Sequence, residues 1–221
     1  MNKFFIISAI LLIGSTSIFS QGWRFGIEAS PQLSWMKSDK KIVDGDGTRF
    51  NLGYGLGIDY FFGKNYAFST GITINNTGGK QKFKDSVFFN HNDTLLLAND
   101  ASVSYKLQYL TIPLSLKFTT NEIGYITYYG QLGLTTQVRV KSTADIAANN
   151  YGIEAEKNKE DTRLFNVGYH IGAGIQYSLG GNTALVLGLI YNNGFTDVTN
   201  IKGCDDKTVI NNITLKVGII F

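Results

Sequence analysis

The chain has 221 residues, 43% of them hydrophobic, and a formal net charge of +3. This length suits a single domain, and the near balance of charge points to no strongly charged partner. Lys and Arg are interspersed with Asp, Glu and Asn instead of forming a basic stripe with stacking aromatics, so nucleic acid is excluded as a partner.

The first twenty residues have the pattern of a secretory signal peptide. A charged start precedes an apolar run from Phe4 to Ile13, and small residues follow. The apolar run is too short to span a membrane as a helix, and we expect cleavage before Gln21. A buried helix or a membrane anchor is the alternative. The expected division is a signal peptide, 1–20, and one domain, 21–221.

Alternation of apolar and polar residues predicts eight β-strands in the remaining chain. In the second of them Phe50, Leu52 and Tyr54 alternate with Asn51 and Gly53. The expected strands cover 23–35, 50–62, 66–74, 103–118, 128–140, 165–179, 185–191 and 209–221.

Two positions interrupt this pattern. Pro31 lies inside the first strand, and we expect a bulge or a local break there, because proline cannot donate to the ladder. In the fourth strand the apolar residues change parity between Tyr109 and Leu110, which predicts a β-bulge near Gln108. The seventh strand is apolar on both faces, so its register stays open.

Short and long connections alternate strictly between these strands. Short turns are expected near 63–65, 120–122 and 180–182. Polar loops are expected at 37–49, 77–101, 141–162 and 193–207. An up-and-down barrel with all of its short turns on one rim has this alternation, and in outer-membrane barrels the long loops are extracellular.

The apolar parity carries large side chains, whereas the other parity carries Gly, Ser, Thr, Asn, Gln and single charges. A soluble barrel around a ligand has the inverse pattern, so we predict an all-β fold: an eight-stranded antiparallel up-and-down transmembrane β-barrel. A soluble all-β barrel or sandwich is the alternative. Ten glycines are expected to face the crowded lumen: Gly26, Gly53, Gly55, Gly57, Gly71, Gly133, Gly168, Gly172, Gly174 and Gly218.

Aromatic residues gather near the strand ends, as in the interfacial girdles of membrane barrels. The short-turn group is Trp23, Tyr60, Phe62, Tyr66, Phe118, Tyr177 and Phe221, and the long-loop group is Trp35 and Phe50.

Five charged residues have inward parity: Arg24, Glu28, Asp59, Lys117 and Lys216. Because an isolated buried charge is costly, we predict a polar plug of opposite charges in the short-turn half. A sealed lumen is favoured over an ion or proton path.

Signals for catalysis or cofactors are weak. The single cysteine, Cys204, is expected to be an unpaired thiol, and Asp44 to Gly47 resembles a calcium loop that lacks its later acidic ligand. His170 has inward parity and is expected to be a satisfied lumen histidine rather than part of a hydrolase, and His91 lies in a loop near Asp93. The sequence therefore nominates no catalytic residue, no metal ligand and no cofactor.

The run from Tyr109 to Phe118 resembles the signature strand of the PorT-like outer-membrane β-barrel family. Phe25 to Ile27, Gly172 to Ile175 and the terminal Phe221 fit the same family in the same order. The resemblance covers the whole mature chain. It implies an integral protein of the bacterial outer membrane and places Pro113 on the inward parity near a strand end. The family's namesake takes part in a protein-secretion machine of the outer membrane.

We therefore expect a non-enzymatic outer-membrane barrel that presents its extracellular loops for binding or envelope assembly. The alternatives are an accessory component of a secretion machine, a narrow channel and a lipid-modifying enzyme. The expected partners are outer-membrane lipid, the barrel-assembly machinery during insertion and, in the secretion alternative, secretion-system proteins.

Overall fold

The computed structural model describes residues 22–40, 43–84, 87–91, 94–98, 101–148, 151–157, 161–201 and 206–221. Its strands are β1 (Trp23–Ser38), β2 (Val43–Gly45), β3 (Arg49–Gly63), β4 (Tyr66–Phe83), β5 (Val87–His91), β6 (Thr94–Ala98), β7 (Ser102–Thr119), β8 (Ile126–Ala148), β9 (Tyr151–Lys157), β10 (Phe165–Gly180), β11 (Thr183–Gly194) and β12 (Thr208–Ile220). No helix among these residues could cross a membrane. The expected signal peptide and Cys204 lie outside the described residues.

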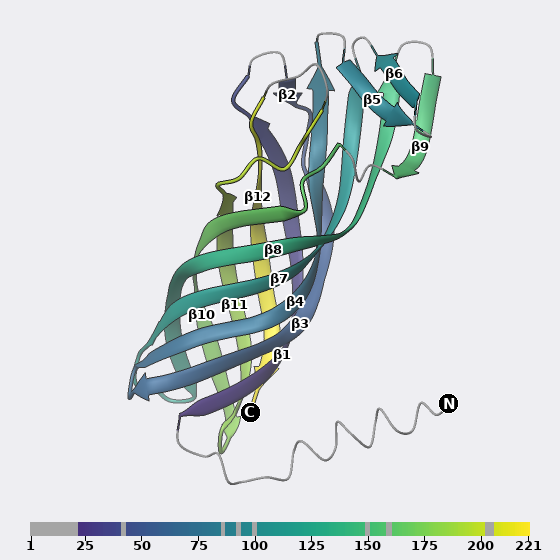
Figure 1. Cartoon of the computed structure of the whole chain (residues 1–221). Coiled ribbons are helices and arrows are strands. Elements are labelled where there is room, and N and C mark those ends of the chain that lie inside the picture. The colour runs from purple at the N-terminus through teal and green to yellow at the C-terminus, as the bar shows by residue number, and fades with distance from the viewer. Residues whose placement is uncertain are drawn as a thin grey trace, which may run out of the picture.

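Eight of these strands form a closed antiparallel barrel (Figure 1). Neighbouring strands pair in the order β10, β11, β12, β1, β3, β4, β7, β8, and the pairing of β8 with β10 closes the ring. The predicted fold, an eight-stranded up-and-down barrel, is confirmed. All eight predicted strands exist, and most are longer than expected.

Short turns and long connections lie on opposite rims. The short turns follow β3, β7 and β10, and in the last of them Gly180 and Gly181 take the positive φ angles, 109° and 62°, that a tight turn requires. The two ends of the barrel meet on the short-turn rim, because the N–H groups of Phe25 and Phe221 each donate to the other's carbonyl oxygen. Figure 1 shows the C-terminus and the start of β1 together at this lower rim.

Large apolar side chains cover the outside of the barrel. On β3, Phe50, Leu52, Tyr54 and Leu56 are all exposed, and every other barrel strand repeats this outward pattern. An apolar belt of this extent is far larger than soluble monomers expose, which indicates a lipid environment. All the residues of the predicted short-turn girdle are exposed, and Trp23 and Tyr60 pack with their ring centres 4.6 Å apart.

The lumen is too narrow for side chains at many glycine positions. A Cβ on Gly133 would overlap the Leu114 carbonyl oxygen, and one on Gly218 would come within 2.6 Å of the Ile27 carbonyl oxygen. The crowding predicted for the ten glycines holds for all except Gly57, whose nearest neighbour would be 3.5 Å away. Gly188, which is not among the ten predicted glycines, has an equally crowded position.

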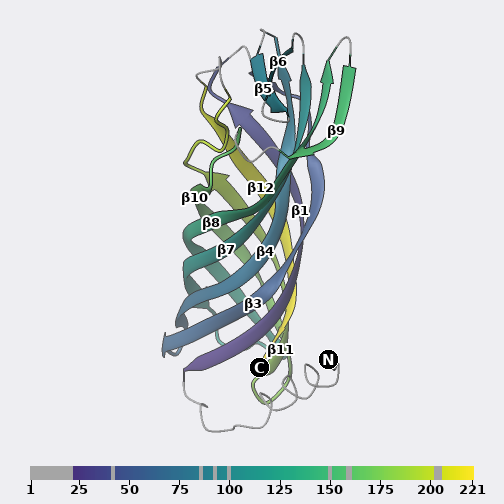
Figure 2. The same ribbon diagram turned by 45° about the vertical axis from the view of Figure 1, so that its right-hand side comes forward.

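Three barrel strands continue well beyond the long-loop rim. β4 runs to Phe83, β7 begins at Ser102, and β8 runs to Ala148 and pairs with β9. Figures 1 and 2 show this extension standing above β10 and β11, with the β5–β6 hairpin near its top. The prediction that 77–101 and 141–162 are polar loops is therefore wrong for much of their length.

The extension inverts the hydrophobic pattern of the barrel. On β7 the odd-numbered side chains face inward throughout: Ser115 and Lys117 in the barrel, Tyr105 and Leu107 in the extension. On this strand, the inward residues are mostly polar where the outward face belongs to the apolar belt and mostly apolar in the extension above it. The predicted change of face in this strand is wrong, because the environment outside the strand changes while the face stays the same.

A register irregularity does lie at the predicted level, but the extra residue is on β8. Gln108 pairs with Lys141 while Tyr109 pairs with Arg139, so Val140 has no partner on β7. Val140 and Lys141 are consequently both exposed on the outward face.

Pro31 interrupts one ladder without a bulge. β1 pairs continuously with β3 through Pro31, whereas its pairs with β12 stop at Ala29 and resume at Gln32 in the same register. The predicted local break is present. The open register of the seventh predicted strand is also resolved, since Ala184 and Val186 face inward.

Candidate functional site: a closed lumen and the extension above it

Four charged side chains form an ionic layer in the half of the lumen nearest the short turns. The Lys117 ammonium lies 2.5 Å from a carboxylate oxygen of Asp59, and the Lys216 ammonium lies 2.5 Å from a carboxylate oxygen of Glu28. The side chains of the first pair are only 4% and 9% exposed. The predicted plug of opposite charges is therefore present.

Apolar and aromatic groups pack against the ionic layer. The Lys117 ammonium lies 4.8 Å from the centre of the Tyr129 ring, and Arg24, the fifth predicted inward charge, lies over the Phe61 ring. A buried apolar cluster completes this end: Tyr129, Ala184, Val186 and Ile220. The lumen is filled by side chains here, as expected for eight strands.

A polar chamber of about 80 Å³ lies above the ionic layer. Its wall is internally hydrogen-bonded, since Asn192 donates to Asn212 over 2.6 Å and Thr214 donates to Gln32 over 3.2 Å. A volume of this size holds on the order of five water molecules. The chamber is therefore a hydrated pocket within the wall of side chains and is not a wide pore.

His170 lies in the wall of this chamber and is 3% exposed. The Ser115 hydroxyl lies 2.7 Å from its Nε2, and the Thr135 hydroxyl lies 2.8 Å from its Nδ1. Both ring nitrogens thus have a partner, one as donor and one as acceptor in the neutral ring. The prediction of a satisfied inward histidine is confirmed.

The contact between Ser115 and His170 is the arrangement that a serine nucleophile requires. The third group, Thr135, is a hydroxyl where hydrolases of this type use a carboxylate. Sequence reasoning missed Ser115 and Thr135 because they lie on other strands. Both have inward parity, Thr135 two residues after Gly133 on β8 and Ser115 opposite Gly133 on β7, and Gly133 also pairs with His170. This shared inward parity is the signal that could have found them.

An apolar cap closes the lumen above the chamber. Two of its members, Val198 and Ile201, come from the described part of the connection between β11 and β12, residues 195–201, and both are buried. The Val198 N–H donates to the Thr208 carbonyl oxygen over 2.9 Å. The apolar cap consists of Met36, Val43, Phe83, Ala101, Val103, Tyr105, Leu107, Tyr109, Ala144, Ile146, Val198, Ile201 and Ile210.

Polar contacts hold the mouth segments beneath the extension. The Arg139 guanidinium donates to the carbonyl and hydroxyl oxygens of Thr162, and Thr162 pairs with Thr199 in an isolated bridge. Arg163 pairs with Asp197 over 3.0 Å. Segments 161–164 and 195–201 are thereby tied to each other across the mouth.

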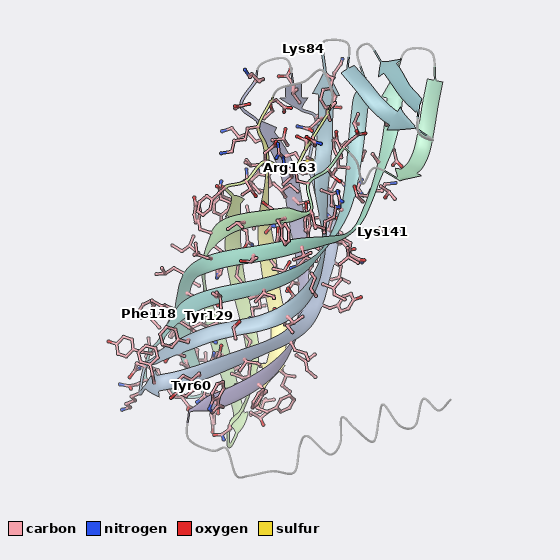
Figure 3. All side chains as sticks on the ribbon, in the orientation of Figure 1. Tyr60, Lys84, Phe118, Tyr129, Lys141 and Arg163 are labelled. Atoms are coloured by element: carbon pink, nitrogen blue, oxygen red, sulfur yellow. The ribbon has the colours of Figure 1, made fainter. Side chains whose placement is uncertain are left out.

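The outward face of the extension carries a groove of about 420 Å³ between β4, β7 and β8. Lys80, Ser102, Ser104 and Asp145 line it together with Asp46. Figure 3 shows Lys141 projecting outward where the barrel gives way to the extension, Lys84 at its top, and Tyr60 and Phe118 near the opposite rim.

The remaining predicted sites do not converge. Asp44 pairs with Lys84 over 2.6 Å, and Asp46 accepts a hydrogen bond from Ser102, so these carboxylates contact other partners than a shared metal. Within the described residues no three His, Cys, Asp or Glu side chains gather as metal ligands. The His91 side chain lies outside the described part of the chain, as does Cys204.

Several solved structures are similar to this chain. Neisserial surface protein A shares 14% sequence identity, with 89% of this chain and 95% of that chain covered and a TM-score of 0.48. The attachment invasion locus protein Ail of Yersinia pestis shares 16%, with coverage of 91% and 99% and a TM-score of 0.44. OprG of Pseudomonas aeruginosa shares 14%, with coverage of 91% and 97% and a TM-score of 0.44.

No curated protein sequence matches this chain. The family of outer membrane protein beta-barrel domains matches residues 19–200, which is most of the chain. With its closed barrel and apolar belt, the chain belongs to this family of bacterial outer-membrane proteins.

Proposed function

We propose that this protein is a non-enzymatic surface barrel that presents its extension to a partner outside the cell. The apolar cap is the observation on which the proposal depends, because it closes the lumen and gives the extension a packed core of its own. A platform built from paired strands presents a preformed surface, which lowers the entropy cost of binding.

Family membership supports the orientation. Outer-membrane barrels keep their short turns in the periplasm and their long connections outside. The three short turns and both ends of the barrel share one rim here, so the extension and the segments of the mouth lie on the extracellular side in this proposal.

The test is partner capture with a matched variant. A tagged full-length copy and a copy in which 85–100, the β5–β6 hairpin with its flanks, is replaced by a short Gly-Ser turn would be purified from gently solubilised outer membranes. A partner recovered at fixed ratio by the first and lost by the second supports presentation. A partner recovered equally by both contradicts a role for the hairpin.

A PorT-like role in a secretion machine is the second candidate, and the resemblance of the Tyr109 to Phe118 strand favours it. Co-purification with other secretion subunits at fixed ratio, together with retained cargo in a deletion strain, would support it. Recovery with only lipid and the barrel-assembly machinery would count against it.

A narrow channel is disfavoured by the ionic layer and the cap, which occupy the lumen at two levels. Folded protein in a planar bilayer is expected to produce no conductance steps. Regular steps from correctly folded protein would overturn the sealed lumen.

A lipid-modifying activity is tested at His170, which Ser115 and Thr135 contact inside the closed lumen. We expect His170→Ala to leave lipid A composition unchanged by mass spectrometry. The free energy of unfolding of the His170→Ala variant should fall by about 1–3 kcal/mol, because two buried hydroxyls lose their partner. Altered lipid A with unchanged stability would instead indicate catalysis.

A further inference from the structure

We propose that a stripe of lysines beside the groove, on the outward face of β4, β7 and β8, binds a phosphorylated sugar head group of the surrounding outer-leaflet lipopolysaccharide. Four lysines make up this basic face: Lys80, Lys82, Lys106 and Lys141. Of these, Lys80 also lines the groove, together with the carboxylates of Asp46 and Asp145. This inference rests on the proposed orientation, in which the extension stands outside the cell.

The four lysines form one continuous stripe. Lys80 pairs with Ser104 across β4 and β7, which makes it a diagonal neighbour of Lys106. Lys141 pairs with Gln108 across β7 and β8, which makes it the next diagonal neighbour of Lys106. Diagonal neighbours on a sheet face lie about 7–8 Å apart, within reach of one multivalent anion.

Three of the four lysines form no ion pair among the described residues, although Asp46 and Asp145 line the adjoining groove. Lys106 pairs with Asp145 over 2.5 Å, whereas Lys80, Lys82 and Lys141 are exposed and have no ion pair in the part of the chain that the structure describes. Repulsion among neighbouring cations is reduced when an anion binds between them. Lysine is a common point-charge partner of phosphate in proteins.

The groove also presents groups that suit sugar hydroxyls. Ser102 donates to Asp46 over 3.2 Å, and Ser104 accepts a hydrogen bond of 2.7 Å from Arg49. Serine hydroxyls and the carboxylate of Asp46 can exchange these bonds for bonds to a ligand. Cations beside hydroxyls and carboxylates match a sugar phosphate better than a bare phosphate.

The position of the basic face along the barrel axis indicates that this ligand comes from the membrane. Val140, 55% exposed, continues the lipid-facing belt on β8, and Lys141 follows it on the same face because of the bulge. The first cation therefore stands where acyl chains end and phosphorylated sugars begin. Lys80 and Lys82 lie farther along the extension, at the level of the sugars above.

The test uses the full chain in phosphatidylcholine nanodiscs, titrated with deep-rough lipopolysaccharide and with the same lipid stripped of its phosphates. Bound lipid is counted by native mass spectrometry. The test variant is Lys80→Gln/Lys106→Gln/Lys141→Gln. The control variant, Lys37→Gln/Lys40→Gln/Lys207→Gln, removes the same charge from exposed lysines away from the groove. Heat-dependent gel migration checks that each variant is folded.

We expect the test variant to lose affinity about tenfold or more, and the control to stay within about twofold of the unaltered chain. Added salt should weaken binding, because exposed charges are screened within about 10 Å at 0.1 M. Equal binding of the dephosphorylated lipid, or an unaffected test variant, overturns the proposal. If millimolar inorganic phosphate displaces the bound lipopolysaccharide, the lysines recognise free phosphate and not the lipid head group, which overturns the proposal. Conductance in a planar bilayer, or the absence of a protein partner, would contradict the proposed function. Neither finding would change the lipopolysaccharide binding measured for the lysine variants.

Discussion

Among the ion pairs that the structure describes, Lys117 with Asp59 is the most buried. A second contact to Asp59 comes from the Ser69 hydroxyl. A pair in this position contributes little net stability, because desolvation of both charges offsets their attraction. Removal of one partner is different, since the other charge then stays buried without compensation.

Lys117→Met should therefore destabilise the barrel by about 3–5 kcal/mol. The double variant Lys117→Met/Asp59→Leu should be much less affected, because neither charge remains. Lys64→Met, at an exposed turn position, should stay within about 0.5 kcal/mol of the unaltered chain. Equilibrium urea unfolding in phosphatidylcholine vesicles measures all three. Equal losses in the single and double variants would mean that packing, and not charge, determines the cost.

Gly188 gives a second prediction at this scale, because a Cβ there would overlap the Tyr129 hydroxyl oxygen. We expect Gly188→Ala to cost about 1–3 kcal/mol, as overpacking does. Addition of Tyr129→Phe should restore most of the loss, since the overlapping atom is then gone. Gly130→Ala is the control, with its nearest atom 3.9 Å away. The same unfolding measurement applies, and a failure of Tyr129→Phe to rescue would show that the backbone is the obstacle.

At the scale of strands, the sequence predicts the barrel better than the extension. Alternating parity locates all eight strands and the inward charges, because lipid outside and a polar lumen impose opposite chemistry on the two faces. The same rule fails above the rim, where Tyr105 and Leu107 face inward like Lys117. The uniform odd parity from Val103 to Lys117 is the signal that could have shown one uninterrupted strand.

The candidate groove was not predictable for a related reason. Its residues lie on segments that look like polar loops in the sequence. Lys80, Ser102 and Asp145 come to share one outward face only in the longer strands of the structure. The pairing of β4 with β7 and of β7 with β8 brings them together. Register across strands is the information that one sequence does not carry.

The bulge on β8 gives a prediction at the element scale. Deletion of Val140 should leave the extension folded, because Arg139 and Ser142 then keep their inward positions in a regular ladder. Deletion of Gln108, at the same level of β7, should turn Tyr105 and Leu107 outward and disrupt the cap.

Limited proteolysis of the two folded barrels distinguishes these deletions. The extension should resist protease after deletion of Val140 and become sensitive after deletion of Gln108, while both barrels retain heat-dependent migration. Equal sensitivity would indicate that the bulge itself is needed for the extension, through the twist that it adds.

At the scale of the whole molecule, two layers of side chains fill the lumen, one of them ionic and the other apolar. The ionic layer closes the half near the short turns, and the apolar cap closes the half near the long connections. The polar chamber lies between them, and Thr214 and His170 are part of its lining. In the proposed role such a barrel acts as a support, and its binding surfaces lie outside the filled lumen.

This closure predicts slow entry of charged reagents into the chamber. In a Cys204→Ser background, Thr214→Cys places one thiol in the chamber wall, and Lys207→Cys places one at an exposed position as the control. A charged methanethiosulfonate reagent should label the chamber thiol on the order of a hundredfold more slowly than the control, because a charge entering an apolar cap loses its hydration. Labelling is followed by mass spectrometry on folded protein, and urea should abolish the difference.

Adding Val198→Asp, which breaks the cap, should accelerate labelling of the chamber thiol. Rapid labelling with the cap intact would mean that the mouth opens, and the channel hypothesis would then replace the sealed support.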